Sequence, residues 1–152
     1  MQREFPSVPL VGVGAIIVDG NEVLLIRRAQ KPMKGCWSIP GGMLELGESL
    51  LEGVRREARE ETCLVVEPVE VVEVLDRIYR EDGRVRYHYV IVDYLCRVTG
   101  GSLQAASDAA EARWTAPSEW SNSSELALDP ITVRVLEKAW QRSQDLHSQE
   151  AQ

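Results

Sequence analysis

The stretch from Gly41 to Leu64 constrains this 152-residue chain more than any other. Two glycines open it, and the pattern Ser49-x-x-Glu52 is typical of a capping box at the start of a helix. We expect the helix to run to about Thr62. The sequence therefore predicts a glycine turn, a short connection and then an amphipathic helix.

The two sides of this helix differ in chemistry when its residues are placed about 100° apart around the axis. The predicted buried stripe consists of Leu51, Val54 and Ala58. Glu57, Glu60 and Glu61 have i, i+3, i+4 spacing and share a neighbouring face, which Gly53 leaves open one turn earlier. Three carboxylates this close repel one another unless water or a cation separates them. Such hard oxygen ligands suit Mg²⁺ or Mn²⁺.

The spacing of charged residues in this stretch fits the pattern G-x5-E-x7-R-E-U-x-E-E-x-G-U, where U is aliphatic. The matching positions are Gly42, Glu48, Arg56, Glu57, Glu60 and Glu61. This closely resembles the Nudix box, the signature of the Nudix hydrolases. Two positions depart from it: Ala58 is a weak aliphatic residue, and Cys63 stands where the family has glycine. We expect that position to end the helix in the left-handed conformation, which Cys63 enters at a cost.

The resemblance implies hydrolysis of a nucleoside diphosphate linked to another group, by attack of water on a pyrophosphate phosphorus. It also implies Mg²⁺ or Mn²⁺ as cofactor. Glu57 and Glu61 are the expected principal metal ligands, with Glu60 as a ligand or base. The Gly41 carbonyl is a further candidate ligand. By family likeness, Arg56 forms an ion pair with the glutamates of the box.

Residues other than the metal ligands are expected to contact the substrate. Arg27 and Arg28 end a strand near the predicted position of the glycine turn, and by resemblance Arg28 is a candidate phosphate contact. Glu45 and Glu48 are further candidates in the loop before the helix. A pair between Glu48 and Arg56 requires that loop to fold back, because eight residues exceed i+4 reach within a helix.

One more carboxylate is expected downstream of the box. The helix glutamates approach a metal from one side only, and the attacking water needs a positioned base. Asp108 and Glu111 are the candidates. We favour Glu111 because it precedes Ala-Arg-Trp. The alternative is a solvent-facing residue on an edge strand, unpaired or paired with Arg113.

The remaining elements indicate an α/β protein. The expected strands are Val11–Val18, Glu22–Arg28, Val65–Tyr79, Val85–Val98, Ser102–Gln104 and Glu111–Thr115. A short helix is predicted from Pro117 to Trp120, and a long helix from Pro130 to about Leu146. The resemblance adds the architecture, a mixed curved sheet between helices in an α/β/α sandwich. We expect a single domain over residues 1–152, with its core at about 11–146.

Composition limits the partners and the compartment. A net charge of −7 argues against a nucleic-acid or membrane surface, and no stretch is apolar enough to cross a bilayer. The three cysteines are widely spaced and form no CxxC pair, which favours reduced thiols in the cytoplasm. The expected partner is a small nucleotide. Oligomeric state is open, with a homodimer as one option.

The substrate is less constrained than the reaction. The segments Arg84–Cys96 and Asp108–Trp114 are similar to those of bacterial ADP-ribose pyrophosphatases, which favours ADP-ribose or a related nucleoside diphosphate sugar. One alternative is a housecleaning enzyme for oxidised or noncanonical nucleoside triphosphates. The other is a non-catalytic nucleotide sensor. The complete set of helix glutamates argues against the sensor, and Cys63 leaves it some room.

Overall fold

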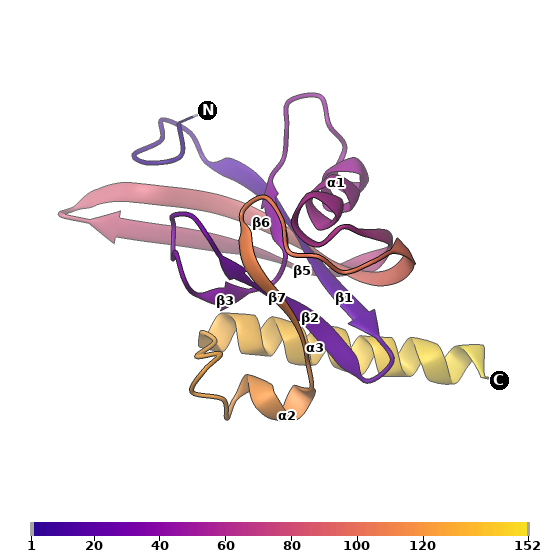
Figure 1. Ribbon diagram of the computed structural model, residues 1–152. Coiled ribbons are helices and arrows are strands. Elements are labelled where there is room, and N and C mark those ends of the chain that lie inside the picture. Colours follow the sequence, from indigo (N-terminus) through magenta and orange to yellow (C-terminus); the bar gives the residue numbers. More distant parts are fainter. Residues whose placement is uncertain (1, 152) are drawn as a thin grey trace.

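A mixed sheet with helices on both faces forms the protein, and the computed structural model describes residues 2–151 (Figure 1). Its strands are β1 (Leu10–Asp19), β2 (Glu22–Arg28), β3 (Trp37–Ser38), β4 (Gly41–Met43), β5 (Leu64–Glu81), β6 (Arg84–Gly101) and β7 (Ala109–Thr115). Its helices are α1 (Leu50–Thr62), α2 (Pro117–Trp120) and α3 (Pro130–Glu150). Strand β1 runs parallel to β6, and the other pairings are antiparallel. The expected α/β architecture is confirmed.

The sheet divides between β1 and β2. These strands pair only beside their connecting turn, at Val18 with Val23 and Asp19 with Glu22. Beyond it, β1 continues with β6 and β4, whereas β2 continues with β7 and β3. The chain crosses from β3 on one half to β4 on the other, and the Ala15 amide donates to the Pro40 carbonyl at 2.8 Å. Gly41 and Gly42, predicted to form a turn, instead begin strand β4 and pair with Gly14 and Val13 of β1. The bend at Pro40 and these two glycines, called the glycine turn below, lie where the two halves separate.

Each face of the sheet carries its own core. The core under α1 consists of Val54 and Ala58 with residues such as Val13, Leu24 and Val92. The core under α3 consists of Val135, Leu136 and Ala139 with residues such as Ile16, Leu25 and Trp120. Figure 1 shows α1 and α3 on opposite sides of the strands. Side chains that alternate along a strand thus point to different helices.

The ends of α1 form as the sequence predicts. The Ser49 hydroxyl accepts from the Glu52 amide at 3.2 Å, and the Glu52 carboxylate accepts from the Ser49 amide at 3.0 Å. Cys63 has φ 62° and ψ 10°, and its amide donates to the Arg59 carbonyl at 2.9 Å. The helix therefore ends in the left-handed conformation expected at the position of Cys63.

Two predictions about the surroundings of α1 are wrong. One concerns which leucine is buried, and the other concerns a short strand at residues 102–104. Leu51 is 43 % exposed, and its neighbour Leu50 packs against the core instead. Residues 102–104 form no strand. The irregular segment there caps the helix, because the Gln104 amide donates to the Thr62 carbonyl at 2.9 Å and the Ala106 amide to the Glu61 carbonyl at 3.0 Å. These bonds satisfy carbonyls that a helix end leaves without intrahelical partners.

Strand β5 is the outer strand of the sheet beside β6, and several of its aliphatic side chains face solvent. The exposed ones are Val65, Val69, Val71, Val74 and Ile78.

Helix α3 extends past the predicted end near Leu146 to Glu150. Of the helices within residues 2–151, none has both the length and the apolarity needed to cross a membrane.

Replacing Cys63 by glycine should stabilise the protein by up to ~1 kcal/mol, because glycine adopts a positive φ without the Cβ penalty. Urea unfolding of Cys63→Gly against the wild type measures the change. Cys63→Ala is the matched control, since it removes the thiol but keeps the Cβ and should give no gain. A destabilised Cys63→Gly would mean that packing of the thiol outweighs the backbone strain.

Candidate functional site

Two glutamates of α1 lie directly against the glycine turn. The Glu61 carboxylate accepts from the Gly41 amide at 2.9 Å and is 2 % exposed. A Cβ atom added to Gly42 would lie 2.5 Å from the Glu57 carboxylate. Any side chain at this position would therefore displace Glu57, so the missing Cβ is what lets the carboxylate reach the backbone.

Burial of these two carboxylates makes the site electrostatically unusual. Burial and the neighbouring charge of Glu57 raise the pKa of Glu61 to about 8. Burial also raises the pKa of Glu57, while the Arg56 guanidinium opposes that shift. The positive charge of Arg28 opposes this shift by favouring a lower pKa of Glu61. A cation near both carboxylates would remove their repulsion and favour their ionised forms.

The Arg56 guanidinium connects the helix, the preceding loop and β4. It contacts Glu48 through two bonds, Nε to Oε2 at 2.6 Å and Nη2 to Oε1 at 2.9 Å. Nη1 donates to Glu57 at 2.8 Å and to Glu60 at 3.1 Å, and Nη2 also donates to the Met43 carbonyl at 2.9 Å. The loop thus folds back, so the ion pair that the resemblance implied is present.

The loop glutamates differ in their surroundings. Glu48 holds Arg56 with both oxygens and also accepts from the Glu45 amide at 3.1 Å, and the bond from Arg56 lowers the pKa of Glu48. The Glu45 side chain is 66 % exposed and lies 3.7 Å from Arg56. Glu48 therefore positions Arg56 rather than facing a substrate. Glu60, also bound to Arg56, is 47 % exposed and remains accessible.

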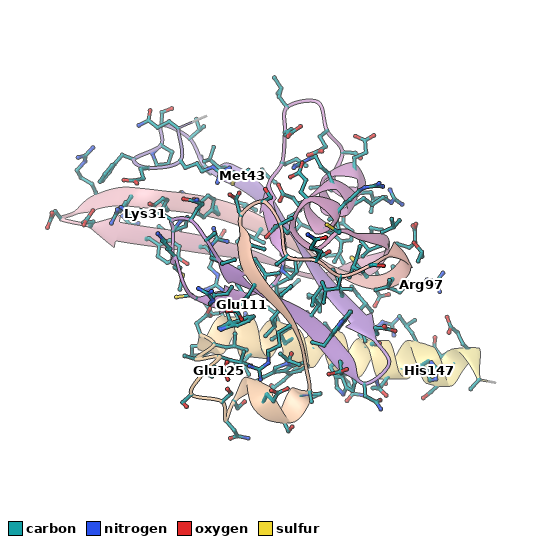
Figure 2. All side chains as sticks on the ribbon, viewed as in Figure 1. Lys31, Met43, Arg97, Glu111, Glu125 and His147 are labelled. Carbon is teal, nitrogen blue, oxygen red and sulfur yellow. The ribbon has the colours of Figure 1, made fainter. Side chains whose placement is uncertain are left out.

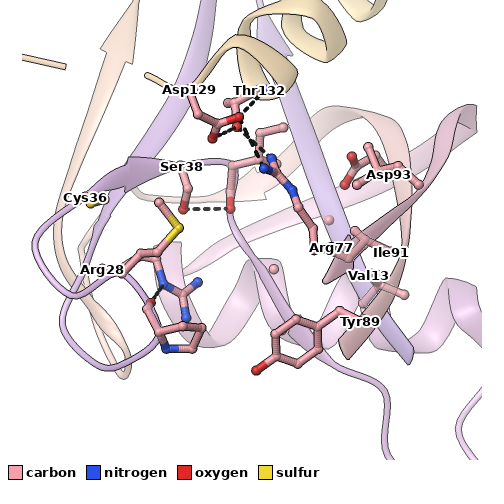
Figure 3. A pocket seen from close by; sticks show the side chains of 18 of the residues that line it. Val13, Arg28, Cys36, Ser38, Arg77, Tyr89, Ile91, Asp93, Asp129 and Thr132 are labelled. Carbon is pink, nitrogen blue, oxygen red and sulfur yellow. Dashed lines mark hydrogen bonds and ion pairs between the residues drawn. The ribbon is translucent and has the colours of Figure 1, made fainter. Parts of the chain in front are cut away.

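A pocket opens beside the glycine turn, and Arg28 is one of its walls (Figure 3). The Arg28 Nε donates to the Pro32 carbonyl at 2.8 Å. Gly41 and Gly42 line the same pocket, and the helix glutamates lie behind them, with Glu61 bonded to the Gly41 amide and Glu57 close to Gly42. Trp37 lies in the pocket wall and is buried, so it packs beneath the loop that leads to Gly41.

Arg27 and Glu111 are not brought to this region. They are direct partners across β2 and β7, and their side chains form an exposed ion pair at 3.0 Å (Glu111 is labelled in Figure 2). Ala112 and Trp114 pack against the core under α1, so strand alternation directs Glu111 to the opposite face. The arrangement does not support Glu111 as a base or metal ligand. Arg113 pairs with other carboxylates.

Three pocket residues were missed by the sequence reasoning. Asp93 is a buried carboxylate on β6, and Arg77 on β5 donates at 3.2 Å each to Asp129 and Thr132 at the start of α3. Asp129 also caps α3, because its side chain accepts from the Thr132 amide. An acidic residue within the apolar run of β6 was the available signal for Asp93, since lone carboxylates are costly to bury.

The oxygen atoms of Glu57 and Glu61 fit a hard divalent cation. Both carboxylates are held close together at the glycine turn, and neither has a full complement of positive partners. Within residues 2–151 there is no preassembled cluster of three or more acidic, histidine or cysteine side chains that would enclose a metal. An open site suits Mg²⁺, which keeps several waters and is commonly bound by one or two carboxylates plus substrate phosphates.

Similarity to known proteins extends over most of the chain. The NUDIX domain family matches residues 8–138. The ADP-ribose pyrophosphatase of Methanocaldococcus jannaschii is 40 % identical over 107 residues, which are 70 % of this chain and 61 % of that protein. The mouse 8-oxo-dGDP phosphatase NUDT18 is 34 % identical over 103 residues, 68 % of this chain and 29 % of that protein.

A solved structure shares the whole architecture. The MutT NUDIX hydrolase from Burkholderia pseudomallei superposes with a TM-score of 0.74 at 30 % identity, covering 87 % of this chain and 98 % of that one. This chain spans less than two thirds of the length of the archaeal and mouse relatives. The family match nevertheless covers most of the chain, including α1 and the glycine turn. By its sequence and its fold, this chain belongs to the NUDIX domain family.

Proposed function

We propose that this protein hydrolyses the pyrophosphate bond of a nucleoside diphosphate linked to another group, with Mg²⁺ or Mn²⁺ as cofactor and ADP-ribose or a similar nucleotide sugar as substrate. The observation that carries the proposal is the pair of carboxylates, half-buried Glu57 and buried Glu61, against Gly41 and Gly42 at a pocket that Arg28 also lines. Burial of such a pair is costly unless a cation compensates it.

Each residue of this site has a distinct task in the proposed reaction. Glu57 and Glu61 would hold the metal, with Glu60 as a further ligand or as the base for the attacking water. When bound, the metal neutralises the diphosphate and lowers the pKa of a bound water. Arg28 would contact a phosphate. Arg56 fixes Glu57 and Glu60 through its Nη1 donor, so that little reorganisation is needed during reaction.

The identity of the substrate rests on the similarity to the archaeal ADP-ribose pyrophosphatase. Cleavage of ADP-ribose would yield AMP and ribose 5-phosphate. Oxidised guanine nucleotides are a second candidate substrate, and the similarity to the 8-oxo-dGDP phosphatase supports them. A sensor without activity is disfavoured because the helix carboxylates and their arginine are all present and interconnected.

Replacing either buried carboxylate should remove activity. Glu57→Gln and Glu61→Gln should each lower kcat by at least ~100-fold, as loss of a catalytic or metal-binding group does. EDTA should abolish turnover of the wild type. Glu111→Gln is the matched control, since it changes a carboxylate on the opposite sheet face and should retain near wild-type kcat. Turnover that persists in EDTA, or a fully active Glu61→Gln, would refute the metal assignment.

The pH dependence of thermal unfolding should report on Glu61 without any assay of activity. The pKa of Glu61 is raised to about 8 from an ordinary value of 4.5, so the folded protein binds this proton more tightly than the unfolded chain. Metal-free protein should therefore lose stability as pH rises from about 4.5 to about 8. In EDTA at pH 8, Glu61→Gln should melt at a higher temperature than the wild type, and Mg²⁺ should stabilise only the wild type strongly. Equal melting temperatures at pH 8 would contradict this account.

The substrate class can be read from kcat/KM with ADP-ribose, NADH, diadenosine polyphosphates, 8-oxo-dGDP and 8-oxo-dGTP, with products identified by chromatography. We expect the highest value for ADP-ribose, because the sequence similarity to the archaeal ADP-ribose pyrophosphatase is the greater of the two. A strong preference for either oxidised guanine nucleotide would replace this substrate with the second candidate and would leave the hydrolytic mechanism in place.

A further inference from the structure

One carboxylate in the pocket has no hydrogen-bond or ion-pair partner among residues 2–151. Asp93 is 5 % exposed, and it forms no hydrogen bond or ion pair with any residue in the described range. Its side chain lies against Gly14, where an added Cβ would collide with Asp93 Oδ1. Its oxygen atoms are not among the fully buried ones that lack a partner, so they are reached from the pocket, and a carboxylate this enclosed gains from a hydrogen-bond donor. Its accessible side is the pocket, so a ligand there is positioned to supply the missing donor.

The other polar side chains at this end of the pocket are already engaged. Asp129 accepts from Arg77 at 3.2 Å, from the Thr132 amide at 3.0 Å and from the Thr132 hydroxyl at 2.7 Å. Arg77 also donates to Thr132 at 3.2 Å. Figure 3 shows Asp93 and Asp129 on opposite sides of the Arg77 side chain. Asp93 is therefore the carboxylate that remains open to a ligand at this end.

The surroundings of Asp93 favour a flat ligand group. The apolar and aromatic residues lining the pocket include Trp37, Ile39, Leu75, Tyr79, Tyr89 and Ile91. A planar base can bury both faces against such residues while its edge meets one polar group. A ribose would bring several hydroxyls to this end of the pocket, and hydroxyls that are buried without partners are unfavourable.

We propose that Asp93 is a specificity-determining residue that accepts a hydrogen bond from the exocyclic amino group of the nucleobase, as adenine carries at C6. This inference rests on the proposed function for the class of ligand, a nucleotide whose diphosphate lies at the glycine turn. An ionised carboxylate accepts hydrogen bonds and donates none, so it favours an amino group and disfavours a carbonyl oxygen at the same position.

The ionisation of Asp93 agrees with this role. Burial and the nearby Glu73 raise the pKa of Asp93 to about 6, and the positive charge of Arg77 acts in the opposite direction. The carboxylate is thus mostly ionised at pH 7.5. Arg77 stays bound to Asp129 and Thr132 and contributes its charge at a distance.

Equilibrium binding of two nucleotides that differ by one amino group tests the proposal. AMP and purine riboside 5′-monophosphate are identical except at C6, and neither contains a pyrophosphate bond, so calorimetry measures binding without turnover. The wild type should bind AMP roughly 10- to 100-fold more tightly, as expected for a hydrogen bond to a charged group. Equal affinities in the wild type would overturn the proposal.

Variants identify the residue responsible for the ratio of the affinity for AMP to the affinity for purine riboside 5′-monophosphate. Asp93→Leu should reduce the ratio to about 1, and Asp93→Asn should reduce it at least about threefold, because a neutral acceptor forms the weaker bond. Asp129→Asn is the matched control, since asparagine caps a helix as well as aspartate does, and it should retain the wild-type ratio. A ratio unchanged in Asp93→Asn, or lost in Asp129→Asn, would overturn the assignment to Asp93. If Asp93→Leu does not fold, as judged by circular dichroism, Asp93→Asn decides the result.

The two proposals fail in different ways. A protein that prefers AMP through Asp93 but does not cleave ADP-ribose would refute the proposed substrate and leave the role of Asp93 intact. A protein that cleaves ADP-ribose but binds both monophosphates equally would refute only the role of Asp93.

Discussion

The hydrogen bonds of a single guanidinium group join the loop, the helix and the glycine turn of this protein. Arg56 contacts Glu48, Glu57 and Glu60 and also donates to the Met43 carbonyl at the end of β4. The planar fork of an arginine can satisfy several acceptors in fixed directions, which the ammonium group of lysine cannot do. The positions of Glu48, Glu57 and Glu60 therefore depend on one another through one shared guanidinium group.

The site carries an electrostatic cost that its arginine only partly offsets. Arg56 reaches Glu57 but not Glu61, whose described hydrogen-bond donor is the Gly41 amide. The cost is sustained because the two cores on either side of the sheet supply the stability that the site lacks. The divided sheet explains the location, since β1 and β2 separate there and the turn between β3 and β4 occupies the gap.

Local signals in the sequence predicted local structure well. The capping box at Ser49 and the left-handed end at Cys63 each depend on a few neighbouring residues, and both are observed. The long-range pair between Glu48 and Arg56 needed the family resemblance, because spacing alone could not show that the loop folds back.

Features that depend on distant contacts were not predictable in the same way. The exposure of Leu51 depends on which side of α1 meets the sheet, and the partner of Glu111 depends on the register between β2 and β7. The sequence shows that Asp93 lies on a strand, but only the pairing of β6 with β1 and the pocket beside it reveal that its side chain is largely buried and faces the pocket.

The outer strand β5 has a consequence for behaviour in concentrated solution. An outer strand with exposed β-branched side chains is a template on which another chain can add. Here the exposed valines are interspersed with acidic residues, of which Glu67, Glu70 and Glu73 pair with basic side chains, and the whole chain carries a net charge of −7. Mutual repulsion between copies therefore protects this strand at neutral pH, and colloidal stability should decline as acid or high salt weakens that repulsion.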